Sequence, residues 1–219
     1  MHHSPLTICY FLFSIFLASC TQLPVSPTLS SDESSTTISL GEKPLLTYVH
    51  VETPALEGQN PLYKRSAYIH PLRSPGGEIL TCIQPDDHYH HYGIWNPWTR
   101  THFGEYKVDF WNLADGQGTV RFVEYMDKYE NEGEAGFSVK HDHIYFKNEG
   151  GEGIAISESW NVNIHDAGEK VYTADLAITL KTPLEEAITL EAYRYGGGLG
   201  FRATEEWDTN NSTVLTSEG

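Results

Sequence analysis

The chain has 219 residues, with 14 lysine and arginine residues against 30 aspartate and glutamate residues, and a formal net charge of -16. A nucleic-acid surface needs clustered basic side chains that displace counterions from phosphates, and this sequence contains no basic run. The same charge argues against direct binding to anionic lipids. Hydrophobic residues make up 39% and aromatic residues 12%, which is enough apolar material for one folded domain with a tail.

The first twenty residues have the pattern of an exported lipoprotein. Residues 8–18 form an uncharged apolar run that is too short for a permanent membrane span and long enough for the core of a signal peptide. The run carries no basic residue before it and ends at Leu-Ala-Ser-Cys (17–20), which resembles the bacterial lipobox. This resemblance implies a signal peptide over residues 1–20 and lipidation of Cys20. We therefore expect a cell-envelope protein, periplasmic or at the surface, that contacts the membrane only through this lipid.

Serine and threonine dominate residues 21–40, which show no hydrophobic periodicity, so the composition predicts a flexible tether. The folded domain is then expected over residues 41–219. Its one cysteine, Cys82, lies in a short apolar run and is expected to be a small buried hydrophobe without a disulfide partner. The chain stops in what resembles the start of another strand, which predicts that the domain is incomplete at its C-terminal end.

Seven segments of the domain alternate with period two and are rich in β-branched and aromatic residues. They are residues 45–52, 63–70, 119–126, 137–147, 154–165, 171–181 and 187–195. Turn signals at 148–153 and 166–169 separate three of these segments, and no amphipathic helix of ten or more residues is evident. The pattern predicts an all-β protein with an antiparallel β-sandwich or barrel architecture, and we favour the sandwich.

Glu158 is notable within the segment 154–165. Strand alternation places its side chain on the same face as Ile156 and Trp160. A buried carboxylate requires a partner, a metal ion or a proton, because an isolated buried charge is costly. The functional interpretation is a general acid/base or a ligand, and the alternatives are a salt bridge or an inner face that opens to solvent.

The densest group of chemically active side chains is Pro-Asp-Asp-His-Tyr-His-His-Tyr-Gly-Ile-Trp at residues 85–95. In an extended segment His88 and His90 share one face and His91 faces away. Imidazoles can act as acid and base near neutral pH, so this group is a candidate catalytic site. The structural alternative is a polar loop whose histidines only make hydrogen bonds and stack on tryptophans.

A metal ion is a further interpretation of the same histidines. Two imidazoles spaced like His88 and His90 can chelate one transition metal, and Glu158, His70 or His102 could complete the ligand set. The histidine content therefore leaves metal-dependent and metal-free chemistry open.

Aromatic and charged residues elsewhere add to this group. Asp109 and Trp111 belong to an Asp-Phe-Trp motif, and Trp95 ends the histidine segment. Aromatic rings beside charged groups are the usual lining of a sugar site, although core packing is the alternative for any single ring. The glycine run at 195–200 lacks the helix that a dinucleotide site needs, and Arg202, which follows it, could hold a carboxylate or hydroxyl groups.

Four ordered motifs together resemble an exported bacterial family of unknown function that is often labelled PmoA or methane oxygenase. They are Tyr-Ile-His-Pro-Leu-Arg-Ser-Pro-Gly-Gly (68–77), Asp-His-Tyr-His-His-Tyr-Gly-Ile-Trp (87–95), Asp-Phe-Trp (109–111) and Tyr-Gly-Gly-Gly-Leu-Gly-Phe-Arg (195–202). Tyr89 and Tyr92 replace the proline and arginine usual in the family. Its members are longer, which implies that this chain is a fragment, and their strand pattern resembles the galactose-mutarotase type of sandwich.

The methane label is not expected to describe the activity, because a membrane methane monooxygenase subunit needs several spans and this sequence has one short apolar segment. We expect instead a carbohydrate-active hydrolase, lyase or epimerase that binds a small molecule or glycan and performs an acid/base or hydrolytic step. Two alternatives remain, a metal-dependent enzyme with histidine-bound zinc, copper or iron and a non-catalytic carbohydrate-binding lipoprotein.

In the leading hypothesis Glu158 acts as base or acid and His88 and His91 take the opposite role, while His70 and Arg202 orient hydroxyl groups. Replacing Glu158 with Gln is then expected to abolish turnover and to leave the fold intact.

Overall fold

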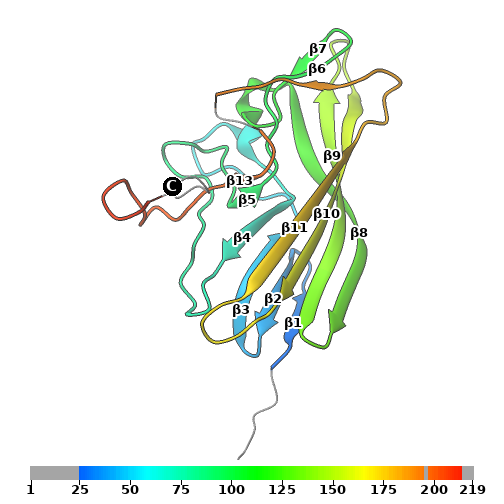
Figure 1. Cartoon of the computed structure of the whole chain (residues 1–219). Helices are drawn as coiled ribbons and strands as arrows, with labels where there is room; N and C mark the ends of the chain where they lie inside the picture. Colours follow the sequence, from blue (N-terminus) through cyan, green and yellow to red (C-terminus); the bar gives the residue numbers. More distant parts are fainter. Residues whose placement is uncertain (1–24, 195–196, 214–219) are drawn as a thin grey trace, which may run out of the picture.

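Three antiparallel sheets make up the protein in the computed structural model, which describes residues 25–194 and 197–213 (Figure 1). The six-stranded sheet runs in the order β1 (Pro27–Ser31), β2 (Ser35–Leu40), β3 (Lys43–Val49), β4 (Tyr68–Leu72), β5 (Ile94–Trp95) and β13 (Gly200–Phe201). The four-stranded sheet runs in the order β11 (Thr173–Lys181), β10 (Glu152–His165), β9 (Glu134–Phe146) and β8 (Gly118–Asn131). The three-stranded sheet runs in the order β12 (Thr189–Leu190), β6 (Thr101–Phe103) and β7 (Tyr106–Val108). Together with two single-turn 3-10 helices, η1 (Pro61–Tyr63) and η2 (Leu113–Asp115), these strands confirm the predicted all-β class.

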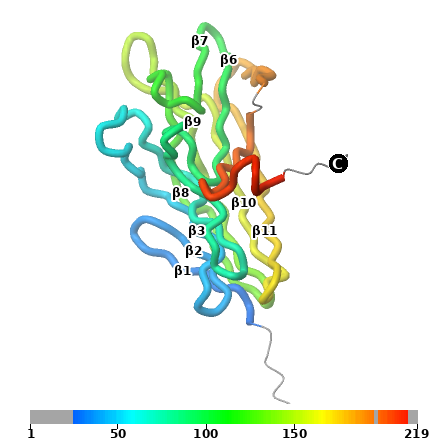
Figure 2. Tube along the Cα trace, turned by 90° about the vertical axis from the view of Figure 1, so that its left-hand side faces the viewer, coloured from blue at the N-terminus to red at the C-terminus, as the bar shows by residue number. Residues whose placement is uncertain are grey.

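The two larger sheets pack face to face. One side of the core comes from β2, β3 and β4, and the other comes from β9 and β10, so apolar side chains of both sheets meet in one layer. Its fully buried members are Ile38, Leu45, Leu46, Tyr48, Ile69, Ala135, Phe137, Val139, Trp160, Val162 and Ile164. The turned view shows β1–β3 and the strands β10 and β11 on opposite sides of the lower half of the molecule (Figure 2). The predicted β-sandwich therefore describes this part of the fold.

A second apolar cluster joins the small sheet to the other end of β8–β10. It contains Phe103, Val108, Phe110, Val120, Tyr145, Ala155 and Ile156. A register shift between Ile154 and Ile156 lets Ala155 and Ile156 both turn inward, whereas Ile154 is exposed. Beyond this bulge the strand alternates regularly, and Glu158 points inward as the sequence pattern predicts.

Residues 27–40 do not form the tether that their composition predicts. They form β1 and β2, and β2 pairs with β3 along its whole length. Thr36 and Ile38 are fully buried, and the hydroxyl of Thr36 donates to Tyr125 Oη at 2.7 Å. Threonine is β-branched and fits a pleated sheet, so the tract contributes strands although it is polar. The folded region thus includes residues before 41, while the expected signal peptide and Cys20 lie outside the described residues.

Most predicted strands exist, with shifted ends. Segments 45–52, 119–126, 137–147, 154–165 and 171–181 correspond to β3, β8, β9, β10 and β11. Segment 63–70 starts instead in the 3-10 turn η1, and only its end enters β4. Among the described residues of segment 187–195, which end at 194, only Thr189 and Leu190 pair with a neighbouring strand, so β12 is short.

The connections between β4, β5 and β6 gather outside the sandwich and build the histidine loop described below. Gly93, at the end of that loop, has a φ of +49° and lies so close to β4 that a Cβ there would meet the carbonyl oxygen of Ile69 at 2.1 Å. Only glycine fits this approach. Within the described ranges no helix is long and apolar enough to cross a membrane.

Candidate functional site

Residues 85–92 form a tight loop and not an extended strand. The backbone N–H of His88 donates to the carbonyl of Pro85 at 2.9 Å, and the N–H of His91 donates to the carbonyl of His88 at 3.0 Å. A bond from the N–H of Gln84 to the carbonyl of His91 closes the loop at 2.8 Å. The turn brings His88 and His91 together, with ring centroids 4.5 Å apart and planes at 12°. The prediction that His91 faces away is therefore wrong, because it assumed an extended backbone.

All three imidazoles of the loop meet at one cavity. The ring of His90 lies 5.6 Å from that of His88 and 4.6 Å from that of His91, measured between centroids. The cavity has a volume of about 660 Å³ and is lined by His88, His90, His91, Thr99, Asp109, Trp111, Asn112 and Tyr193. Five of the residues predicted from sequence, in two separate segments, thus share one pocket: His88, His90, His91, Asp109 and Trp111.

Asp109 shapes the wall opposite the histidines. Its Oδ1 accepts from the backbone N–H groups of Trp111 at 2.7 Å and Asn112 at 2.9 Å, and its Oδ2 accepts from Thr99 Oγ1 at 2.8 Å. These bonds fix the turn that presents Trp111 and Asn112 to the cavity. Trp111 Nε1 and Asn112 Oδ1 are buried without a hydrogen-bond partner among the described residues. Because a buried polar atom without a partner is costly, these two atoms favour a polar ligand in the cavity.

Trp95 supports the cavity from the core side. It is buried, and its ring centroid lies 5.1 Å from that of His91 and 6.5 Å from that of Trp111. It also packs with Tyr68 and Tyr92 in a third apolar cluster beneath the loop. Trp95 is not among the residues that line the cavity, so its role is to hold His91 and Trp111 in place.

Arg202 reaches the histidine loop from β13. Antiparallel pairing of β13 with β5 and a bond from the N–H of Arg202 to the carbonyl of Gly93 at 2.7 Å fix its backbone. Its Nη2 donates to Asp87 Oδ1 at 2.7 Å, and its Nη1 lies 3.4 Å from His91 Nδ1. The other oxygen of Asp87 lies 2.9 Å from His88 Nδ1. The hydrogen bond from Arg202 lowers the pKa of Asp87, so this carboxylate stays ionised between a guanidinium and an imidazole.

Two histidines of the cavity are held in the neutral form. Burial, followed by the nearby His88, lowers the pKa of His90 to about 4. Burial, followed by His90 and His88, lowers the pKa of His91 to about 3. Each ring therefore offers one N–H donor and one acceptor nitrogen at neutral pH.

Glu158 does not enter the cavity. Its side chain is 1% exposed, and its carboxylate accepts from Asn96 Nδ2 at 2.7 Å and from Trp160 Nε1, and pairs with His143 Nε2 at 2.6 Å. His141 Nδ1 lies 3.8 Å from the same carboxylate. The hypothesis that Glu158 and the histidine loop converge is thus not supported, because β10 turns this side chain into the sandwich core.

Arg65 is a buried cation whose pKa responds to the charge of this carboxylate. Arg65 is 1% exposed, and its Nη1 donates to the carbonyl of Phe110 at 3.3 Å. Burial lowers the pKa of Arg65 to about 10, and the charge of Glu158 opposes that shift. Burial alone would raise the pKa of Glu158, but His141 and His143 outweigh it and lower that pKa below its usual range. Glu158 is therefore an ionised structural carboxylate.

The remaining candidates lie beside the cavity or away from it. His70 Nδ1 bonds with Thr81 Oγ1 at 2.9 Å, and His102 Nε2 lies 3.3 Å from Glu191 Oε1. Neither histidine lines the cavity. Cys82 is half-buried, and its thiol donates to the carbonyl of Ala203 at 3.0 Å. In the part of the chain that the structure describes, no group of three or more His, Cys, Asp or Glu residues is placed to hold a metal ion.

His141 and His143 were missed by the sequence analysis, although a signal existed. They occupy the same face of β9 as Phe137 and Val139, all of them buried. The alternation that places Glu158 on an apolar face also applies to segment 137–147. It places both imidazoles on the same face as Phe137 and Val139. No periodic pattern marks the other lining residues Thr99, Asn112 and Tyr193, because only the folding of the loops brings them to the cavity.

Fold and site together define a class of protein, an antiparallel β-sandwich with a histidine-lined cavity built on loops beside one sheet. The chain belongs to DUF6807, a family of unknown function, whose family model matches residues 35–219. The match begins at the start of β2, inside the segment that composition alone assigns to a tether. No curated protein and no solved structure matches the chain significantly.

Proposed function

We propose that the protein is carbohydrate-active, that it binds a sugar in the histidine-lined cavity, and that a proton is transferred there. The observation that carries this proposal is the composition of the cavity wall. The indole of Trp111 offers an aromatic face, while its unpartnered Nε1 and Asn112 Oδ1 offer a donor and an acceptor. A sugar unit combines apolar C–H faces with hydroxyl groups, so it can satisfy all three.

His88 is the group that we propose for proton transfer. Asp87 lies 2.9 Å from its Nδ1, so a proton on Nδ1 is held by the carboxylate and Nε2 is left for the ligand. An imidazole oriented by a carboxylate is a common arrangement for a general base. Arg202 in turn fixes Asp87, which makes Arg202 a positioning residue.

His90 and His91 have a different role in this proposal. Their lowered pKa values keep them neutral at physiological pH. His90 can therefore donate to one hydroxyl and accept from another, whereas His91, whose Nδ1 accepts from Arg202, can donate through Nε2. Glu158 acts at a distance, because its bond to Asn96 holds the end of β5, next to Trp95, which packs against His91.

The setting in the cell is part of the same proposal. The apolar run and the lipobox-like sequence at Cys20 favour an exported lipoprotein of the cell envelope. The proposed activity does not depend on the PmoA label that is sometimes given to similar chains. The galactose-mutarotase type of sandwich remains a fold analogy.

Binding is tested with a panel of neutral hexoses, uronic acids and amino sugars, observed by saturation-transfer NMR on the purified chain. We expect at least one sugar to bind and the signal to weaken at least tenfold in His90→Ala. Val171→Ala, which changes an exposed side chain far from the loop, is the matched control and keeps the signal. A folded protein that binds no sugar, or a His90→Ala variant that binds as well as the parent, contradicts the proposal.

Turnover of a sugar that binds is then compared between the parent and His88→Gln. Loss of a positioned acid/base group costs about a hundredfold or more in rate. We expect this loss with an affinity within threefold of the parent. Unchanged turnover in His88→Gln removes proton transfer at His88 from the proposal.

A further inference from the structure

A second cavity lies between the start of the histidine loop and residues 201–207. Its volume is about 510 Å³, and it is lined by Asp86, Asp87, Phe201, Arg202, Ala203, Thr204, Glu205 and Trp207. It contains two aromatic rings, one guanidinium, three carboxylates and a threonine hydroxyl. This mixture of ring faces, donors and acceptors has the same chemical character as the first cavity.

The two aromatic side chains of this cavity are unusually open. Phe201 is 50% exposed and Trp207 is 46% exposed. The backbone of Trp207 is held in a turn, since its N–H donates to the carbonyl of Thr204 at 3.2 Å, and Asn211 and Ser212 bond back to Asp208 just beyond it. Large aromatic rings displayed together at a surface cavity mark a binding surface more often than single scattered apolar residues do.

The ion pair between Asp87 and Arg202 contacts residues of both cavities. Asp87 and Arg202 line the second cavity, and the same two side chains contact His88 and His91, which line the first. The pair is bonded at 2.7 Å and only partly exposed. A ligand that occupied both cavities would therefore pass over one shared guanidinium and one shared carboxylate, both of which can bond sugar hydroxyl groups.

We propose that the second cavity is a second sugar subsite and that the natural ligand is an oligosaccharide of at least two units. One unit lies against Trp111 and the histidines, and its neighbour stacks on Trp207 and Phe201. The carboxylates of Asp86 and Glu205 accept hydrogen bonds from the hydroxyl groups of the second unit. This inference rests on the proposed function, because it extends the ligand of the same site.

The test is a chain-length series built on the monosaccharide that binds the first cavity, measured by titration calorimetry with the full chain. We expect the disaccharide or trisaccharide to bind at least tenfold more tightly than the monosaccharide. Trp207→Ala is expected to remove this gain and to leave the affinity for the monosaccharide unchanged. Trp207→Phe keeps an aromatic face and is expected to keep most of the gain.

Val171→Ala removes a side chain of similar exposure at a remote turn and controls for general surface effects. Circular dichroism checks that each variant is folded, and Phe201→Ala provides a second probe of the same cavity. An unchanged chain-length gain in both Trp207→Ala and Phe201→Ala overturns the second subsite while the first remains. Absence of binding by every sugar, monosaccharides included, overturns the proposed function and with it this inference.

Discussion

Within the described residues, imidazoles gather around a carboxylate in the core and again at the surface, and these two clusters differ chiefly in their access to solvent. In the core, Glu158 lies between His141 and His143, and all three side chains are at most 1% exposed. At the surface, Asp87 lies beside His88 with side chains 58% and 46% exposed. The difference teaches that residue type alone does not identify a reactive site, because the same groups stabilise the fold when no ligand can reach them.

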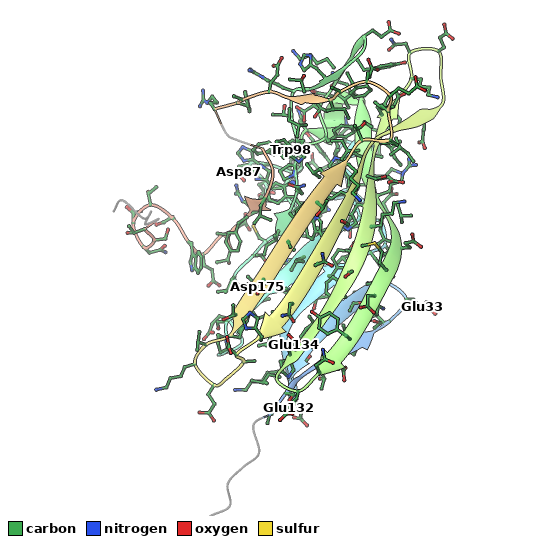
Figure 3. All side chains as sticks on the ribbon, turned by 45° about the vertical axis from the view of Figure 1, so that its right-hand side comes forward. Glu33, Asp87, Trp98, Glu132, Glu134 and Asp175 are labelled. Carbon is green, nitrogen blue, oxygen red and sulfur yellow. The ribbon has the colours of Figure 1, made fainter. Side chains whose placement is uncertain are left out.

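Figure 3 shows the surface cluster through the labelled Asp87, which lies with Trp98 in the upper half of the molecule. Glu132 and Glu134, at the turn between β8 and β9, lie at the opposite end. The core cluster lies between these regions on β9 and β10. It connects to the surface cluster through Asn96, the residue after Trp95, and through Phe110, whose ring centroid lies 5.1 Å from that of His143. The comparison therefore predicts that changes to the core cluster alter stability and changes to the surface cluster alter ligand chemistry.

The largest expected effect is that of Glu158→Gln on stability. Removing one partner of a buried charged pair, here the carboxylate that pairs with His143 Nε2 at 2.6 Å, costs about 3–5 kcal/mol. Urea unfolding measures the change in the free energy of unfolding. Glu152→Gln is the matched control, since Glu152 lies on the same strand and pairs with Arg121 in an exposed ion pair. That substitution is expected to cost no more than about 1 kcal/mol.

Equal stability of Glu158→Gln and Glu152→Gln would show that the core carboxylate is not structural. It would also return Glu158 to the catalytic role that strand alternation first suggested. A Glu158→Gln protein that is destabilised but still binds sugar supports the separation of the two clusters.

A smaller effect is expected from acid. His90 and His91 have pKa values of about 4 and about 3 in the folded chain, below the ordinary value of 6.5, so the unfolded chain binds more protons below pH 6.5. Their contribution to stability is complete above that pH and is lost as the pH falls toward 4. The thermal midpoint should fall by roughly 5 °C between pH 7 and pH 4.5.

The double variant His90→Asn, His91→Asn separates this contribution from that of the core. It should flatten the pH dependence between pH 6.5 and 4.5, whereas Glu158, whose pKa is lowered, loses its contribution only below the usual glutamate range. A slope that persists in the double variant would assign the acid sensitivity to other groups.

The smallest effect on stability is expected for Arg202→Met. It breaks the ion pair with Asp87, and a partly exposed pair contributes about 0–1 kcal/mol. Arg121→Met breaks the exposed pair with Glu152 and serves as control. Both variants should have similar thermal midpoints, but only Arg202→Met should slow turnover, because Asp87 then no longer holds His88. Equal turnover in the two variants would remove the positioning role of Arg202.

The sequence predicted the parts of the fold that follow from alternation. The pattern of residues 154–165 placed Glu158 in the core, since one period-two strand with one buried face leaves little choice. Residues 27–40 show the limit of composition, because Thr36 and Ile38 occupy buried positions within a polar tract. Packing against the facing sheet decides whether such a tract folds, and that sheet is far away in the sequence: Thr36 bonds with Tyr125 of β8.

The sequence indicated several residues that line the candidate site, but not how they are arranged in space. The histidine segment and the Asp-Phe-Trp motif do line one cavity, as a clustering of reactive types suggested. The stacking of His88 on His91 depends on a turn that begins at Pro85, and the arrival of Tyr193 depends on loops from another sheet. Non-local contacts of this kind leave no periodic signal.

The described chain begins at the end of the sandwich that lies farthest from the histidine loop. Ser26 Oγ accepts from the backbone N–H of Gly133 at 3.1 Å, in the turn between β8 and β9. These strands have 14 and 13 residues, a span of about 45 Å at the usual rise per residue. The described chain therefore enters the fold at the end of the sandwich away from the histidine loop. A ligand that approaches the histidine loop does not meet the first described residues of the chain, which lie the length of these strands away.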